Sequence, residues 1–170
     1  MTEERAVDRV QDPHMHAAIA VARRGLAAGE PPVGACLVRG DEVIATLNNA
    51  VISELDATAH AEVRVIREAC RRLRTLELRD CTLYATVEPC LMCLSACHYA
   101  GIDRVVYGAS LADMHAVTGA ELTVAPDDLV RGGLRVVVSG QCLADECRAL
   151  LDDWARGFGP PDRSHTDASS

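Results

Sequence analysis

The sequence predicts an α/β fold, a three-layer α/β/α sandwich around a mixed five-stranded sheet, and three observations support this expectation. The first two expected strands follow each other closely, as in a hairpin, whereas the later strands alternate with helices. Hydrophobic residues make up 49% of the 170 positions, which is enough to fill one core. Aromatic residues make up only 3%, so we expect that core to be aliphatic.

A helix and a hairpin are expected to open the fold. The helix is expected over residues 14–28, where apolar residues recur at helical spacing and Gly29 ends the run. Two strands follow at 33–38 and 43–47. The Gly40-Asp41 pair between them has the chemistry of a hairpin turn, which predicts that the two strands pair with each other.

Helices and strands alternate through the middle of the chain. A second helix is expected over 58–73, with Asp56 as its N-cap, because an Asp side chain accepts hydrogen bonds from free helix amides. A third strand is expected over 81–87, a third helix over 90–100 and a fourth strand over 104–107. This order is typical of parallel strands joined by helices, so the sheet is expected to be mixed.

A fifth strand over 134–138 and a helix over 143–155 complete the expected fold. No internal repeat or linker divides the chain, so we expect one domain over residues 13–156. Residues 1–12 are polar and charged and are expected to form a flexible lead-in. Residues 157–170 contain Pro, Ser and Asp with few apolar residues, which predicts a disordered tail.

Charge and hydropathy disfavour several classes of partner. Seventeen basic and 25 acidic residues give a net charge of −8, and an acidic surface repels phosphate backbones, so a nucleic-acid partner is disfavoured. No apolar run reaches the roughly 18 residues that a membrane span needs, so we expect no membrane association. The chain begins with a charged stretch and not with the apolar segment of a secretory signal, which predicts a cytoplasmic protein.

Two short segments carry candidate zinc chemistry. His60 and Glu62 stand near the start of the second expected helix, and Cys90 and Cys93 stand at the start of the third. Thiolate and imidazole are preferred zinc ligands, and the dipole and free amides of a helix N-terminus stabilise thiolates. A closed structural site would need a fourth protein ligand and would have no use for Glu62. The pattern therefore favours a catalytic zinc site over a structural one.

Cys97 is a further thiol near this motif. It lies seven positions after Cys90 on the same helical face, where it could compete for the metal. It is also two turns from the start of the helix, which is too far to join a site at the terminus. We therefore expect Cys97 to pack in the core, as we expect of the five remaining cysteines, which sit singly in apolar stretches.

These residues resemble the cytidine deaminase superfamily. Within it, the chain is most similar to the branch of guanine deaminases, fungal-type cytosine deaminases and bacterial tRNA adenosine deaminases. The resemblance covers about residues 14–156, and it includes the Pro-Val-Gly-Ala run at 32–35, Asn49 and both zinc segments. It implies a cytidine deaminase-like fold and a hydrolase that removes an exocyclic amine. Ala57, where many members have Pro, is one departure from the pattern.

The resemblance implies a role for each residue of the motif. Zn²⁺ held by His60, Cys90 and Cys93 lowers the pKa of its water, giving hydroxide near neutral pH. Glu62 takes a proton from this water and delivers it to the ring nitrogen and the departing amine of the substrate. Asn49 is expected to hydrogen-bond the substrate, and the other interpretation is that it is only a turn residue.

Three substrates stay open: guanine, cytosine and adenosine in tRNA. We expect a free base, with guanine first, because Asn48-Asn49 and the run that begins at Ala61 resemble guanine deaminases, so Ala61 is also expected at the substrate. Asp113 stands where such enzymes have a second catalytic acid, whose carboxylate could accept two hydrogen bonds from the guanine edge. The alternative for Asp113 is a helix cap. Trp154 could close the pocket or belong to the core.

The case for tRNA rests on residues 143–147 and on a stripe of arginines at helical spacing. The stripe consists of Arg64, Arg67, Arg71 and Arg74. A solvated helix face interleaved with acids would explain the stripe as well. Residues 143–170 carry six acids against three arginines, which opposes phosphate binding. A homodimer is expected by analogy with the family alone.

Overall fold

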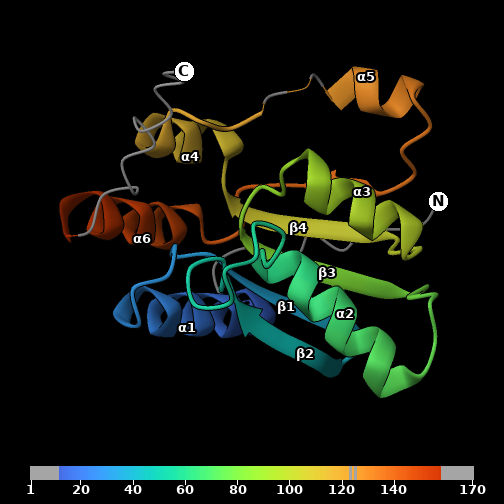
Figure 1. Cartoon of the computed structure of the whole chain (residues 1–170). Helices are drawn as coiled ribbons and strands as arrows, with labels where there is room; N and C mark the ends of the chain where they lie inside the picture. Colours follow the sequence, from blue (N-terminus) through green and yellow to red (C-terminus); the bar gives the residue numbers. More distant parts are fainter. Residues whose placement is uncertain (1–11, 123, 125, 158–170) are drawn as a thin grey trace, which may run out of the picture.

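The computed structural model describes residues 12–122, 124 and 126–157, and in this part of the chain five strands form one mixed sheet (Figure 1). The strands are β1 (Gly34–Arg39), β2 (Glu42–Asn48), β3 (Cys81–Val87), β4 (Arg104–Ala109) and β5 (Val137–Ser139), in the spatial order β2-β1-β3-β4-β5. β1 pairs antiparallel with β2 and β3, whereas β3 pairs parallel with β4, and β4 with β5. The predicted mixed five-stranded sheet is confirmed.

Helices cover both faces of this sheet, which gives the three predicted layers. The helices are α1 (Pro13–Ala27), α2 (Ala61–Leu73), α3 (Leu91–Tyr99), α4 (Leu111–Thr118), α5 (Pro126–Arg131) and α6 (Ala144–Gly157). α1 and α6 contact each other on one face, and α2 and α3 contact each other on the other (Figure 1). α4 packs against α6 beyond the edge of the sheet.

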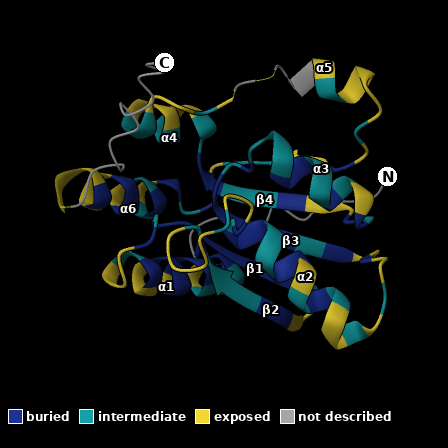
Figure 2. Cartoon of the chain, viewed as in Figure 1, coloured by how far each residue is buried: buried dark blue, intermediate teal, exposed yellow. Residues whose placement is uncertain are grey.

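The core is aliphatic, as the composition predicts. Burial is concentrated in the strands and in the helix sides that face them (Figure 2). The largest fully buried side chains in the described part of the chain include Met15, Ile19, Leu37 and Leu83, and none of this group is aromatic. Small residues line the packing surfaces, so the helices lie close to the sheet.

Two glycines allow this close approach on the α1 and α6 face. A Cβ at Gly34 of β1 would overlap the carbonyl oxygen of Ala18 in α1, and a Cβ at Gly108 of β4 would overlap the Cys147 side chain of α6. The Gly34 amide also donates a hydrogen bond of 3.0 Å to the buried Thr86 hydroxyl of β3. Gly34 and Gly108 therefore set the distance between each helix and the sheet.

The second helix begins later than the sequence predicts. Its first residue is Ala61 and its N-cap is His60, whereas Asp56 accepts hydrogen bonds from the Thr58 amide and hydroxyl at 2.8 Å and 2.7 Å. The predicted N-cap is therefore wrong, because Asp56 closes a local turn before the helix. The third strand matches its predicted bounds, Cys81–Val87, at both ends.

The sequence does not predict α4 and α5, which are both short. α4 buries no residue fully, so it has no apolar stripe to detect, and a capping box at Ser110 defines its start. The fifth strand is Val137–Ser139 and not 134–138, because the Leu134 amide still bonds to the Leu129 carbonyl in the turn that follows α5.

The ends of the chain are described only in part. Asp12, assigned to the lead-in, is the N-cap of α1, and its carboxylate accepts hydrogen bonds from the His14 and Met15 amides at 2.9 Å and 3.4 Å. The remaining predicted lead-in, 1–11, and the predicted tail from 158 onward lie outside the described residues. Among the helices that are described, none is long and apolar enough to cross a membrane.

Gly34→Ala is expected to lower the free energy of unfolding by about 3 kcal/mol or more, because the new methyl group would collide with the α1 backbone. Gly157→Ala is the matched control, since nothing lies within 4 Å of its Cβ position and Ala is the better helix former. Urea denaturation of the zinc-loaded protein measures both changes. Equal stabilities of the two variants would contradict the close α1–β1 packing.

Candidate active site

The topology brings several chain segments together at one edge of the sheet. β2, β3 and β4 run parallel to one another, because β1 is antiparallel to both β2 and β3, and β3 is parallel to β4. Their carboxyl ends therefore share an edge, which is where open α/β sheets bind ligands. α2 follows β2 and α3 follows β3, so both helices begin at this edge and lie side by side (Figure 1).

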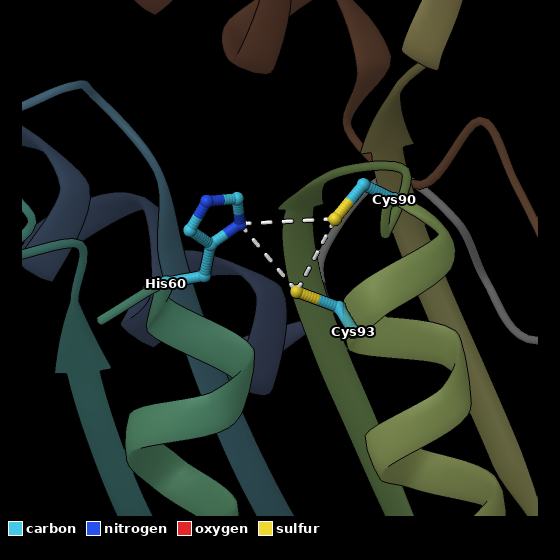
Figure 3. Close-up of side chains that lie close together, drawn as sticks. All are labelled: His60, Cys90 and Cys93. Atoms are coloured by element: carbon cyan, nitrogen blue, oxygen red, sulfur yellow. Dashed lines mark hydrogen bonds between the residues drawn. The ribbon is translucent and has the colours of Figure 1, made fainter. Parts of the chain in front are cut away.

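The three predicted zinc ligands lie at these two helix starts. His60 is the N-cap of α2 and Cys90 is the N-cap of α3, and neither side chain caps its own helix through a hydrogen bond. Cys93 lies in the first turn of α3. The imidazole and both thiols point toward one another (Figure 3). The side chains at these positions therefore face each other and not the helix amides.

The separations within this group fit a tetrahedral zinc ion. Cys90 Sγ lies 3.7 Å from Cys93 Sγ, and His60 Nδ1 lies 3.8 Å from Cys90 Sγ and 3.5 Å from Cys93 Sγ. Zinc bonds of about 2.3 Å to sulfur and about 2.0 Å to nitrogen require edges of about 3.8 Å between sulfurs and about 3.5 Å from sulfur to nitrogen. The donor set and its spacing thus suit Zn²⁺, with one tetrahedral position left open.

The contacts among the three donors shift their pKa values in different directions. The hydrogen bond with Cys93 and the contact with His60 together lower the pKa of the Cys90 thiol to about 4, although burial acts in the opposite direction. The contact with Cys90, together with burial, raises the pKa of the Cys93 thiol. The hydrogen bond with Cys90 likewise raises the pKa of His60. A Cys90 thiolate at a helix N-terminus is a ready ligand for a cation.

Glu62 lies in the first turn of α2, two residues after His60, and is almost fully buried, with 3% of its surface exposed. Burial raises the pKa of its carboxyl group. Its Oε2 atom has no hydrogen-bond partner among the described residues, although such atoms are normally paired when buried. An unpaired carboxylate oxygen beside the donor group is available to a water molecule or a substrate.

A cavity of about 910 Å³ opens onto this group. His60, Glu62 and Cys90 line it together with residues that follow β2, β3 and β4. Its size is at the upper end of the roughly 300–1,000 Å³ that ligand sites occupy. The edge of the sheet therefore combines a metal-donor group, a buried acid and room for a nucleobase.

Of the two predicted substrate residues Asn49 and Ala61, only Asn49 lines the cavity. Asn49 lines the cavity, is 4% exposed, and accepts a hydrogen bond of 3.0 Å from the Val51 amide through Oδ1. Ala61 is fully buried in the hydrophobic core and is not among the residues that line the cavity. Its side chain therefore packs against the core and does not face a bound base.

Asp113 takes part in the capping box at the start of α4. Its carboxylate accepts hydrogen bonds from the Ser110 amide and hydroxyl at 2.8 Å and 2.7 Å, and it lies 3.9 Å from the Arg148 guanidinium. It is absent from the cavity lining, although Leu111 and Met114 on either side are present. The helix-cap interpretation of Asp113 is confirmed, and the geometry gives no support to a substrate role.

Other residues of the cavity are not found by sequence reasoning. Glu121 lines it from the segment after α4, where its carboxylate accepts a hydrogen bond of 2.9 Å from the Thr118 hydroxyl. Only the position of α4, which the sequence does not predict, brings this acid to the site. Trp154 of α6 also lines the cavity while 5% exposed, so both interpretations of this residue apply.

The arginine stripe of α2 is largely neutralised by acids. Arg64 bonds to the Asn48 carbonyl and pairs with Glu54 at 3.0 Å. The next arginines pair with Asp56 and Glu68; these pairs are Arg67–Asp56, Arg71–Glu68 and Arg72–Glu68. The interpretation as a solvated face interleaved with acids therefore describes this surface better than a phosphate-binding stripe does.

The chain belongs to the family described as the cytidine and deoxycytidylate deaminase zinc-binding region, whose model matches residues 9–109. Zn²⁺ is therefore the metal expected for the His60, Cys90 and Cys93 group, as the sequence predicts.

Several relatives of this chain carry names that describe an action on tRNA. The tRNA-specific adenosine deaminase of Bacillus subtilis is 44% identical over 143 residues, which cover 84% of this chain and 87% of that protein. The enzyme of the same name from Aquifex aeolicus is 46% identical over 54% of this chain, and the match spans 61% of the relative's length. The guanine deaminase of B. subtilis is 43% identical over 56% of this chain and 62% of its own length.

Solved structures of both kinds share the fold. The guanine deaminase from Nitrosomonas europaea superposes with a TM-score of 0.77 at 26% identity, covering 86% of this chain and 87% of that one. A tRNA:A34 deaminase superposes with a TM-score of 0.71 at 31% identity, covering 81% and 97%. The comparisons correct the expectation that a nucleic-acid partner is disfavoured, and they favour the tRNA alternative over guanine.

Removing one ligand is expected to release the metal. The purified protein should hold about one Zn²⁺ per chain, and Cys90→Ser should lose most of it, because two remaining ligands bind zinc weakly. Cys97→Ala is the matched control, since Cys97 is fully buried in the core and outside the donor group. Elemental analysis measures both. Loss of zinc from Cys97→Ala with retention by Cys90→Ser would show that the ligands are assigned wrongly.

Proposed function

We propose that this chain deaminates adenosine at the wobble position of tRNA, converting it to inosine within the tRNA and releasing ammonia. One observation carries the choice of substrate: the similarity to a tRNA-specific adenosine deaminase extends over 84% of this chain and 87% of that relative, whereas the guanine deaminase match covers little more than half. The donor group, buried acid and cavity support the deamination itself.

The chemistry is a hydrolysis in which His60, Cys90 and Cys93 hold the metal and Glu62 moves the protons. When bound, Zn²⁺ supplies the acidification that makes water a nucleophile near neutral pH. The Glu62 carboxylate carries one proton from the attacking water to the ring nitrogen, and then carries the second proton, from the hydroxyl group so formed, to the leaving amine. A C–O bond forms at the amine-bearing carbon as the C–N bond breaks, so water is consumed and ammonia is released.

Asn49 is proposed to orient the base. Its Oδ1 atom is engaged by the Val51 amide, so its NH₂ group is the part that can donate to an acceptor on the base. Adenine presents such an acceptor in a ring nitrogen. Apolar residues of the cavity, including Val33, Val51 and Met114, supply surfaces against which a planar ring packs.

Guanine deamination is the second candidate, and Glu121 favours it. Its carboxylate lies in the cavity, and guanine presents an N–H and an amine that a carboxylate can accept. Glu121 would then take the part that the sequence gives to Asp113. A structural relative has been solved in complex with the purines 8-azaguanine and 2,6-diaminopurine, which also supports a purine base as the substrate.

Ammonia release from a panel of substrates separates the two candidates. The zinc-loaded protein is expected to deaminate an anticodon stem-loop with adenosine at the wobble position, and to release little ammonia from free guanine, cytosine or adenosine, because the flanking nucleotides contribute to binding. A stem-loop with guanosine at that position is the control. Rapid deamination of free guanine with none of the stem-loop would establish the second candidate instead.

Glu62→Gln is expected to lower turnover by roughly 10²–10⁴-fold while the zinc content stays at the level of the unchanged protein. The amide keeps the size of the carboxylate but cannot carry a proton between water and the leaving amine. Single-turnover kinetics and elemental analysis on one preparation give both values. Turnover close to that of the unchanged protein would rule out Glu62 as the proton carrier.

The predicted homodimer and cytoplasmic location stay predictions. Analytical ultracentrifugation of the zinc-loaded protein tests the first, with a mass of twice 18.2 kDa expected.

A further inference from the structure

Glu30 is a buried acid outside the proposed chemistry. It lies between the end of α1 and the start of β1 and is 4% exposed. Its two carboxylate oxygens accept hydrogen bonds from two consecutive backbone amides in the segment after β2. Oε2 accepts from the Ile52 amide at 3.0 Å, and Oε1 accepts from the Ser53 amide at 2.7 Å. A buried carboxylate that uses both oxygens on backbone amides fixes the segment to which those amides belong.

The segment it holds, residues 49–54, lines the cavity. Asn49, Val51 and Ile52 are among the lining residues. Ile52 and Ser53 are themselves exposed, so water could reach this loop and its amides have little protection from their own side chains. Glu30 itself is not among the residues that line the cavity.

A second charged group holds the same loop. Arg64 of α2 bonds to the carbonyl of Asn48 just before the loop, and pairs with Glu54 at its end. Burial opposes the charge on Glu30, but the hydrogen bonds from Ser53 and Ile52 and the positive charge of Arg64 together lower the pKa of its carboxyl group. Glu30 is therefore ionised, as a clamp on two amides requires.

We propose that Glu30 is a positioning residue: its buried carboxylate holds the 49–54 loop in the one conformation in which Asn49 and Ile52 meet the substrate. This inference rests on the proposed function, because it takes the cavity as the substrate site. Glu30 touches neither substrate nor metal donors. Its effect on the reaction passes through the loop, so it changes substrate binding more than the chemical step.

Glu30→Gln tests the proposal, since an amide offers one acceptor and turns a donor toward the second backbone amide. Hydrogen exchange in the zinc-loaded protein should accelerate about 10-fold or more at Ile52 and Ser53, and stay unchanged at Leu83 in the core. With the wobble-adenosine stem-loop, KM should rise about 10-fold while kcat changes less than about twofold. Glu42→Gln, which removes an exposed charge on the hairpin, is the matched control and should change none of these values.

Glu30→Asp keeps the charge but shortens the side chain by one methylene, so it decides the matter if Glu30→Gln does not fold. It should accelerate exchange at one or both amides and raise KM in the same direction. Exchange rates and KM values equal to those of the unchanged protein in a folded Glu30 variant would overturn the proposal. If the unchanged protein deaminates no substrate of the panel, the proposed function fails, while the exchange rates still decide whether Glu30 holds the loop.

Discussion

The start of α2 and the start of α3 must meet within bonding distance of one ion, and the architecture follows from this constraint. β1 lies between β2 and β3 and is antiparallel to both, so β2 and β3 point the same way and the helices that follow them begin at one edge. His60 and Cys90 are 30 positions apart, and α2 and β3 lie between them. On the opposite face, Gly34 and Gly108 let α1 and α6 lie close to the same sheet.

The chemistry was easier to predict from the sequence than its surroundings. Zinc ligands need fixed residue types at fixed spacing, so His60, Cys90 and Cys93 can be recognised from the sequence alone. β3 is equally visible, because a buried strand between polar turns has a plain pattern. The cavity wall is different: Glu121 and Asp113 are eight positions apart, and only the capping box at Ser110, the Arg148 pair and the turn after α4 decide which acid faces the site. These contacts belong to the tertiary structure, so the sequence pattern alone does not reveal them.

An RNA substrate sets a physical problem for so acidic a chain. The net charge is −8, and Arg64, Arg67 and Arg72 of α2 are already paired with acids. Phosphate contacts therefore contribute less here than in basic RNA-binding proteins. Recognition would depend more on the shape of the cavity and on apolar surface at its edge, where Ile52 and Leu122 are exposed. A loop held in place by the buried Glu30 carboxylate suits this kind of recognition.

The central claim is an open zinc site made by three side chains at two helix starts. X-ray absorption at the zinc edge of the purified protein measures it most directly, because it counts the ligands by element. We predict two sulfurs at about 2.3 Å and two lighter atoms at about 2.0–2.1 Å, one from His60 and one from solvent. Addition of a substrate-like inhibitor should change only the lighter shell. Three or four sulfurs, or a shell that no inhibitor alters, would contradict an open His60, Cys90 and Cys93 site.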